Sequence, residues 1–321
     1  MTGIDLPIRR TQDARDARRL ADRSPPDRSI RVLAATDGRP QSDLALLAAR
    51  RLETEETLGI LTVLPHRADD PPLDDEEIVA DQYSHRSRVE WQVRRVLGND
   101  AKARIEMRSG DPPITLASAA AEHETPLLVV GIGRPKVGDR LLGDESALRL
   151  VRAAKTPVLA IAPGCSLPAH SIIVAVDFSP TSFAAARLAL RLAAPKADVL
   201  LVHVAARPGE IVWGSAAAGF RGDADLALEH WCDRLRRDFN ATVSAIVLHG
   251  DPATELIAVA SNRGADLVAV GAYGHGPATR GEIGSVTARL VRCASYSVVV
   301  MPRCDATCDT SVRSRRVPGA T

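Results

Sequence analysis

The feature of this sequence that most constrains its fold is an internal repeat with an offset of 140 positions. Trp91 falls on Trp231, and the tripeptide Gly-Asp-Pro at 110–112 falls on the same tripeptide at 250–252. Tryptophan occurs only three times in the chain, so two of the three at one offset indicate common descent of the two halves. Self-similarity at a fixed period is the signature of tandem structural units. The sequence therefore predicts two copies of one domain, each of roughly 135 residues, which is a common domain size.

Both copies show the same order of apolar and polar segments. A first strand (31–36 or 172–176) ends on an Asp, a helix follows (43–51 or 182–194), and a second strand comes next (59–64 or 199–204). After a variable stretch come a helix with the repeated Trp, a third strand ending at Gly-Asp-Pro, and two more strands, at 127–130 and 158–161 or at 267–270 and 298–301.

These strands are apolar on both faces and alternate with helices, a pattern typical of a parallel sheet covered on two sides. We therefore expect the α/β fold class, with two tandem doubly wound five-stranded domains of the Rossmann-like type. The domains are expected at 30–164 and 170–303, between an Arg/Asp-rich disordered arm at 1–29 and a flexible tail at 304–321. Ligands of such sheets bind beyond the carboxyl ends of the strands, where the strand order reverses.

A glycine pattern follows the fourth strand of the second copy. Gly271 and Gly274 are followed, after nine residues, by Gly284-Ser285-Val286. Glycines let the backbone approach an anion closely, and a helix start supplies free N–H groups and the positive end of the helix dipole. The pattern predicts a phosphate cradle.

The first copy has lost this pattern. Its matching stretch reads Gly131-Ile-Gly-Arg134 and then Gly143-Asp144, so an Arg replaces the second glycine and an Asp replaces the serine. The Arg side chain would crowd the path of the phosphates, and the Asp would repel them. We expect the first copy to be a degenerate partner that holds no nucleotide.

Together these residues resemble the universal stress protein family. The resemblance rests on Asp177 with Phe178-Ser179, on the strand Leu201-Val-His-Val204, and on the spacing Gly271-x2-Gly274-x9-Gly284-Ser285-Val286. It covers residues 29–303 and identifies the chain as similar to a tandem member whose second domain binds ATP. In that family, domains pair through their last strands, which implies intramolecular pairing of the two domains here and allows a homodimer as well.

The resemblance also implies a role for each matching residue. Asp177 would contact the adenosine, with Ala175 beside it and the backbone of Val204 facing the base. Val270 and Gly271 would line the ribose and phosphate side. The phosphates would be held by backbone N–H groups and the Ser hydroxyl at Gly274, Gly284, Ser285 and Val286. Mg²⁺ is expected with ATP, since a bare triphosphate needs a counter-charge. Ala175 and Tyr273 depart from the family's usual Pro and His.

Plainer roles and other functions stay open. Asp177 also suits a turn cap, Gly271 and Gly274 suit a strand-end turn, and Gly284-Ser285 suits a helix start. Trp91 and Trp231 are expected in the core, and His203 is expected to pack within its strand. His275 and Arg280 could contact phosphate oxygens or solvent. A scaffold or interaction module without nucleotide is one alternative. An adenine-nucleotide hydrolase or adenylating enzyme is another, although residues 177–182 lack the glycine pair of such enzymes. No catalytic residue or metal site is predicted, and no Gly-x4-Gly-Lys-Ser/Thr loop is present, so we expect at most slow ATP hydrolysis.

Composition narrows the expected partners and location. The net charge is +1 and aromatic residues make up 3% of the chain, so neither nucleic acid nor a membrane is an expected partner. Residues 1–29 lack the apolar segment of a secretory signal, and the cytoplasm is the expected location.

The expected function is a stress-response regulator that binds one ATP and acts on a protein partner the sequence does not identify. The segment at 206–225 is interpreted as a lid over the nucleotide or a mobile loop.

Overall fold

The fold is described on a computed structural model, which places residues 30–53, 55–66, 74–132, 144–165, 167–205, 224–239, 241–274, 283–292 and 295–303. The expectations for the arm at 1–29, the tail at 304–321 and the segment at 206–223 lie outside the described residues.

The two copies form two units with the same element order. The first unit contains β1 (Val32–Thr36), the 3-10 turn η1 (Pro40–Ser42), α2 (Asp43–Leu52), β2 (Leu58–Pro65), α3 (Asp75–Leu97), β3 (Ala103–Gly110), α4 (Pro112–Glu122), β4 (Leu127–Gly131), α5 (Asp144–Ala153) and β5 (Val158–Ile161). The second unit contains β6 (Ala169–Val176), α6 (Pro180–Arg191), β7 (Ala193–Ala205), α7 (Ala224–Phe239), β8 (Thr242–His249), α8 (Pro252–Asn262), β9 (Leu267–Gly271), α9 (Ser285–Arg292) and β10 (Ser297–Met301).

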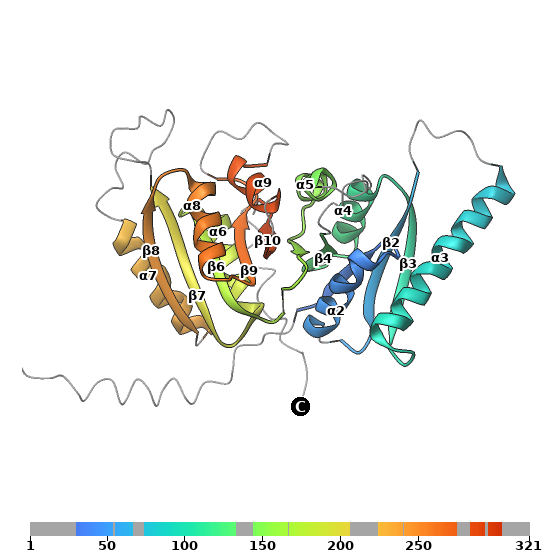
Figure 1. Cartoon of the computed structure of the whole chain (residues 1–321), viewed down its shortest axis with the longest axis horizontal. Coiled ribbons are helices and arrows are strands. Elements are labelled where there is room, and N and C mark those ends of the chain that lie inside the picture. The colour runs from blue at the N-terminus through green and yellow to red at the C-terminus, as the bar shows by residue number, and fades with distance from the viewer. Residues whose placement is uncertain are drawn as a thin grey trace, which may run out of the picture.

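All ten strands join in one sheet, in the order β3-β2-β1-β4-β5-β10-β9-β6-β7-β8. Every neighbouring pair is parallel except β5 and β10, which pair antiparallel with Leu159 opposite Val299. Figure 1 shows the units side by side, with β10 and α5 in the middle and with α3 and α7 at the outer flanks. The last strands of the two units therefore pair within one chain, as the resemblance implies.

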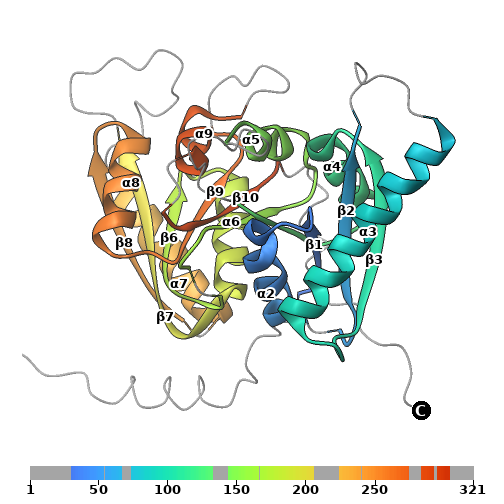
Figure 2. The same cartoon turned by 45° about the vertical axis from the view of Figure 1, so that its right-hand side comes forward.

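Each face of the sheet has its own hydrophobic core, and each core runs through both units. One lies under α2, α3, α6 and α7, and includes Leu159 and Val299 of the central pair. The other lies under α4, α5, α8 and α9, and includes Val158 and Val298. Figure 2 shows α2 and α3 together in front of β1 and β2. Because both cores cross the central strand pair, burial of apolar surface stabilises the contact between the two units as well as the fold of each unit. No helix within the described ranges combines the length and apolarity that a bilayer crossing requires.

The predicted helix at 182–194 is wrong at both ends. The helix begins at Pro180 and ends at Arg191, and residues from Ala193 onward belong to β7. Ala193 pairs with Ala169, and the Ala169 N–H donates to the Leu192 carbonyl at 2.9 Å. Alanine favours helix, but this backbone pairing with the start of β6 outweighs a preference worth only tenths of a kcal/mol per residue.

The expectation that both repeated tryptophans are core residues is wrong for Trp91, which is 62% exposed. Trp231 is half-buried, and its ring lies edge-on to Phe178 and to Phe183, at centroid distances of 5.8 and 4.8 Å. At the matching positions the first unit has Gly38 and Asp43, which offer no ring to pack against. Trp91 is covered only in part, by the Arg95 guanidinium, 5.0 Å from the ring centroid.

A buried polar cluster fixes α3 to the sheet in the first unit. His85 is 3% exposed and lies between Thr62 and Arg88, at 2.7 Å from the Thr62 hydroxyl and 2.9 Å from the Arg88 guanidinium. A guanidinium can only donate, so Nδ1 accepts from Arg88 and Nε2–H donates to Thr62. Burial and the nearby Arg88 charge lower the pKa of His85, while Asp37 acts weakly in the opposite direction.

This arrangement predicts a stability that depends on pH through His85. The folded state holds the imidazole neutral and the unfolded chain protonates it near its ordinary pKa of 6.5, so the free energy of unfolding falls as the pH drops below about 6.5. In His85→Gln the fall between about pH 7 and pH 5 should be shallower, as urea unfolding will show. His170→Gln, at an exposed histidine, is the control for the loss of an imidazole elsewhere in the protein. Equal slopes for the parent and His85→Gln would contradict the assignment.

Candidate functional site

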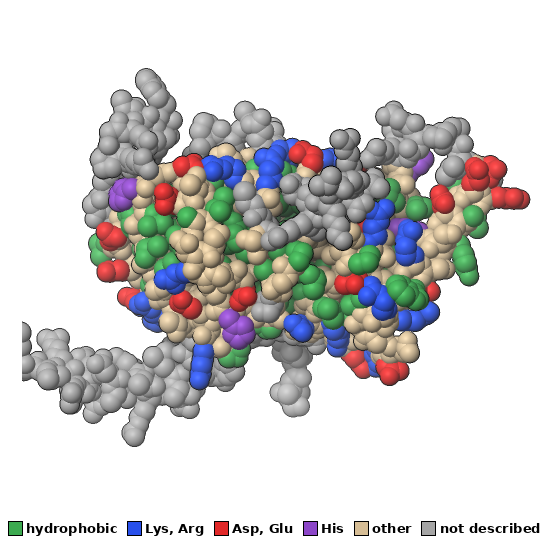
Figure 3. All heavy atoms as spheres, viewed as in Figure 1, with side chains coloured by type: hydrophobic (Ala, Val, Ile, Leu, Met, Phe, Trp, Pro, Cys, Tyr) green, Lys and Arg blue, Asp and Glu red, His purple; other side chains and the backbone are tan. Residues whose placement is uncertain are grey.

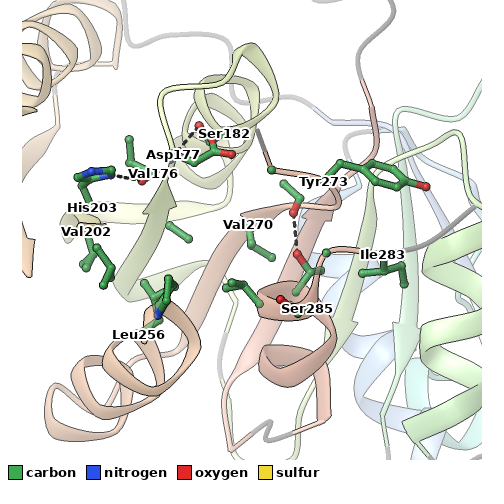
Figure 4. Close-up of a pocket in the computed structure, with 18 residues that line it drawn as sticks. Val176, Asp177, Ser182, Val202, His203, Leu256, Val270, Tyr273, Ile283 and Ser285 are labelled. Atoms are coloured by element: carbon green, nitrogen blue, oxygen red, sulfur yellow. Dashed lines mark hydrogen bonds between the residues drawn. The ribbon is translucent and has the colours of Figure 1, made fainter. Parts of the chain in front are cut away.

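A cavity of about 420 Å³ lies at the carboxyl ends of β6, β7 and β9, beside α8 and the start of α9. Strand β6 lies between β9 and β7 in the sheet, so the cavity is at a point where the strand order reverses. Figure 4 shows the side chains that surround it. All nine residues of the predicted site line this cavity: Ala175, Asp177, Val204, Val270, Gly271, Gly274, Gly284, Ser285 and Val286.

Asp177 is positioned by the turn between β6 and α6. Its Oδ1 accepts from the Ser179 backbone N–H at 3.0 Å and from the Ser179 hydroxyl at 2.6 Å. Ser179 in turn is the N-cap of α6 and accepts from the Ser182 N–H at 3.1 Å. Ser179 thus both caps α6 and orients the Asp177 carboxylate. Asp177 therefore bonds within the turn and also lines the cavity.

Phe178 adopts a left-handed backbone conformation with φ of 62° between Asp177 and Ser179. This conformation is costly for a residue with a Cβ. Ring contacts offset this cost. The ring centroids of Phe178 and His203 are 4.6 Å apart, and the Phe178 ring packs edge-on against Trp231. The aromatic cluster of Phe178, His203, Trp231 and Phe183 therefore fixes the turn that carries Asp177.

The glycine loop leaves little space for side chains. A Cβ at Gly274 would lie 3.3 Å from Oδ2 of Asp177, and one at Gly284 would lie 3.4 Å from the Ala272 carbonyl. The Gly284 N–H already donates to that carbonyl at 2.9 Å, so this amide is engaged within the loop. The Thr287 hydroxyl donates to the Gly271 carbonyl at 2.7 Å, which fastens the first turn of α9 to the end of β9.

The start of α9 faces the cavity through Ser285, Val286 and Thr287. The first N–H groups of a helix have no partner within it and lie at the positive end of its dipole. Arg303 does not line the cavity, but its guanidinium lies over the ring of the lining residue Tyr273, 5.1 Å from the ring centroid. This end of the cavity suits an anion, and the other end, with Val202, Val204 and Leu256, suits a flat apolar group.

Some lining residues were not among the predicted ones. His203 was expected to pack within its strand; it also lines the cavity, and its Nδ1–H donates to the Val176 carbonyl at 2.8 Å. Leu256 and Ile283 come from α8 and from the residue before Gly284. Of these three residues, only His203 could have been assigned to the cavity from the sequence, because it lies in the strand 201–204 that carries the family resemblance. His275 and Arg280, considered as phosphate contacts, lie outside the described residues.

The first unit builds the matching turn differently. Arg39 stands where the second unit has Ser179, and η1 starts there without a side-chain cap. Asp37 accepts from the Ser42 hydroxyl at 2.9 Å and lies 3.8 Å from the Arg39 guanidinium. The aspartate that survives in the first unit is therefore engaged by a cation of its own turn. Arg134 and Gly143 lie outside the described residues, and Asp144 is described only as the first residue of α5.

A sequence profile of the universal stress protein family matches residues 30–162 and again residues 168–302. The chain belongs to the universal stress protein family. The two matches correspond to the two units of the structure, so this member carries the family's domain twice. Both halves keep the family fold, although the first has lost the glycine pattern.

Known proteins of the family resemble the greater part of this chain. Universal stress protein Rv2005c of Mycobacterium tuberculosis is 29% identical over 218 residues, which are 65% of this chain and 72% of that protein. A crystal structure of a universal stress protein from Archaeoglobus fulgidus, 17% identical, covers 85% of this chain and 98% of its own, with a TM-score of 0.65. A putative universal stress protein from Pseudomonas aeruginosa, 12% identical, covers 86% of this chain and 94% of its own, with a TM-score of 0.51. These two structures share the fold of this chain.

Gly131 and Gly271, at the ends of β4 and β9, should differ in how well they tolerate substitution by alanine. A Cβ at Gly131 would lie 2.6 Å from the Gln41 carbonyl oxygen, whereas one at Gly271 would meet the end of the Thr181 side chain at 3.1 Å. Backbone cannot move aside as a methyl group can, so Gly131→Ala should cost about 1–3 kcal/mol of unfolding free energy and Gly271→Ala less. Urea denaturation of both variants tests this, and a larger loss in Gly271→Ala would contradict it.

Proposed function

We propose that this universal stress protein binds one ATP, with Mg²⁺, in the cavity of its second unit, and that the nucleotide state regulates a protein partner in a stress response. The observation that carries the proposal is the convergence of nine motif residues, from three strand ends and one helix start, on a single cavity. Its volume lies within the range of small-molecule sites, about 300–1,000 Å³.

The chemistry of the walls matches the parts of ATP. The apolar side chains of Val202, Val204 and Leu256 suit the faces of an adenine ring. The Asp177 carboxylate, held by Ser179, suits the hydroxyl groups of a ribose. The N–H groups at the start of α9 suit phosphate oxygens, as helix N-termini do in other nucleotide sites.

Mg²⁺ fits this site as a companion of the phosphates. It commonly binds through one or two carboxylates together with substrate phosphates, and among the described residues Asp177 supplies a carboxylate to the cavity wall. Within the described ranges no three His, Cys, Asp or Glu side chains gather into a metal site. When bound, the ion would neutralise phosphate charge, which the described residues at the start of α9 offset through backbone dipoles.

The first test transfers the sequence of the first unit into the second. In Gly274→Arg/Ser285→Asp the new guanidinium fills the space beside Asp177, and the new carboxylate stands at the helix start where phosphate should bind. Calorimetric titration with Mg-ATP should give one site per chain in the parent and at least tenfold weaker binding in the variant, which is about 1.4 kcal/mol. No binding by the parent would refute the proposal and favour an interaction module. Two sites would show that the first unit is competent.

The two aspartates provide a matched pair of variants. Asp177→Asn should weaken Mg-ATP binding, because it removes the charge at the ribose and metal end of the cavity. Asp37→Asn makes the same change in the first unit and should leave the affinity unchanged. Both carboxylates also bond within their turns, so urea denaturation of each variant separates a loss of fold from a loss of binding. Equal weakening by both variants would contradict the assignment of the site to the second unit.

A further inference from the structure

A stripe of exposed residues runs along α3, on the side opposite the sheet. Val79, Tyr83 and Trp91 are 63, 74 and 62% exposed, while His85 and Val89 on the other side of the helix are buried. Together with Ser87 and Arg95, both exposed, these residues recur at every fourth position. Such positions form one continuous ridge on a helix. The ridge contains two of the six Trp and Tyr residues of the whole chain.

Helix α3 lies at the outer flank of the first unit, far from the strand pair that joins the units (Figure 1). It spans 23 residues, and α7, its counterpart in the second unit, spans 16 within the described part of the chain. Trp231 of α7 packs against Phe178 and Phe183, and the first unit has no aromatic residue at either matching position. The first unit thus exposes Trp91, whereas the matching Trp231 of the second unit packs against aromatic rings of that unit.

We propose that the ridge of Val79, Tyr83, Ser87, Trp91 and Arg95 is an interface between two copies of this chain, with the two α3 helices antiparallel about a two-fold axis at Ser87. Under this symmetry a residue and its partner have numbers that sum to 174. Tyr83 of each copy meets Trp91 of the other, Val79 meets the aliphatic part of Arg95, and Ser87 meets itself. The small serine at the centre lets the helices approach closely, and the large rings pack on either side of it.

The charges along α3 agree with an antiparallel pair and oppose a parallel one. The exposed acidic residues Asp74, Glu76 and Glu77 lie at the start of the helix, and the exposed Arg94 and Arg95 lie at its end. Within its own chain Arg95 pairs with Asp43 at 2.7 Å, and Arg94 lies 3.5 Å from Glu90, so Arg94 is the more available of the two cations. Figure 3 shows the acidic side chains at the outer tip, where Figure 1 places the start of α3. In the antiparallel arrangement each acidic end lies along the basic end of the other copy, which favours the correct orientation.

The last strands of the two units are not available for such an association. β5 and β10 each have neighbours on both sides within one chain, so their edges are already paired. Association through α3 leaves this strand pair and the cavity of the second unit untouched. The interface is therefore independent of nucleotide binding and can be tested without a ligand.

Sedimentation velocity of the full-length protein over a range of concentrations tests the interface. The parent should show a monomer–dimer equilibrium, and Tyr83→Glu/Trp91→Glu should shift it at least tenfold toward monomer. The control is Ile114→Glu/Leu226→Glu, at two residues of similar exposure on other helices, which should behave as the parent. Circular dichroism establishes that each variant is folded. A parent that stays monomeric at every concentration, or a dimer that both double variants weaken equally, overturns the proposal.

A cysteine at the symmetry centre tests the register. Ser87→Cys should form a disulfide-linked dimer on mild oxidation, because the two thiols meet at the axis. Ser84→Cys, three residues away on α3, should not, because its two copies are separated along the helix pair by more than disulfide geometry allows. The parent gives the background from its own five cysteines. Equal cross-linking at both positions, or none at Ser87→Cys, contradicts an antiparallel pair centred there.

Discussion

The antiparallel pairing of β5 with β10 is the interaction on which the rest of this structure depends. A parallel five-stranded sheet built by one unit has an open edge at its last strand, and an unpaired edge invites association with other chains. Here each unit closes the edge of the other, and both hydrophobic cores continue across the junction. Helices α5 and α9 also meet there, with Arg292 of α9 3.8 Å from Glu145 of α5. Duplication of the domain has thus turned a possible contact between chains into one within a chain.

Within this shared frame, a few substitutions give the two units different turns after their first strands. Serine at 179 caps α6 and holds Asp177, whereas arginine at the matching position 39 caps nothing and pairs with Asp37. Phenylalanine at 178 ties the turn of the second unit to an aromatic cluster, and Gly38 takes its place in the first. The order of the strands is the same in both units. The turn after the first strand differs, because the residues there decide how the next helix begins and how the aspartate is held.

The first unit has replaced the aromatic cluster with hydrogen bonds. Gln92 stands at the position of Cys232, and its side chain bonds with Thr36, with Asp43 and with the Arg39 carbonyl. With His85 and Thr62, these bonds hold α3 to the sheet through polar groups that are satisfied inside the protein. The helix keeps its place without needing Trp91 in the core, so the outer face of α3 became free to change. The two units have diverged in different places, the second at the cavity by its strand ends and the first on the exposed outer side of α3.

The sequence by itself determined the duplication, the order of the elements, the parallel character of each half and nine of the residues that line the cavity. These follow from the periodicity of the sequence and from motif residues at the ends of strands and helices. The tertiary structure decided what depends on neighbours distant in sequence. Ala193 joined a strand because Ala169 lay beside it, and Trp91 became exposed because Gly38 and Asp43 replaced the rings that Trp231 packs against. The amide of Gly284 was already taken by Ala272, which no spacing of glycines reveals. A local pattern specifies which groups are present, whereas packing across the sheet specifies which of them are buried, paired or exposed.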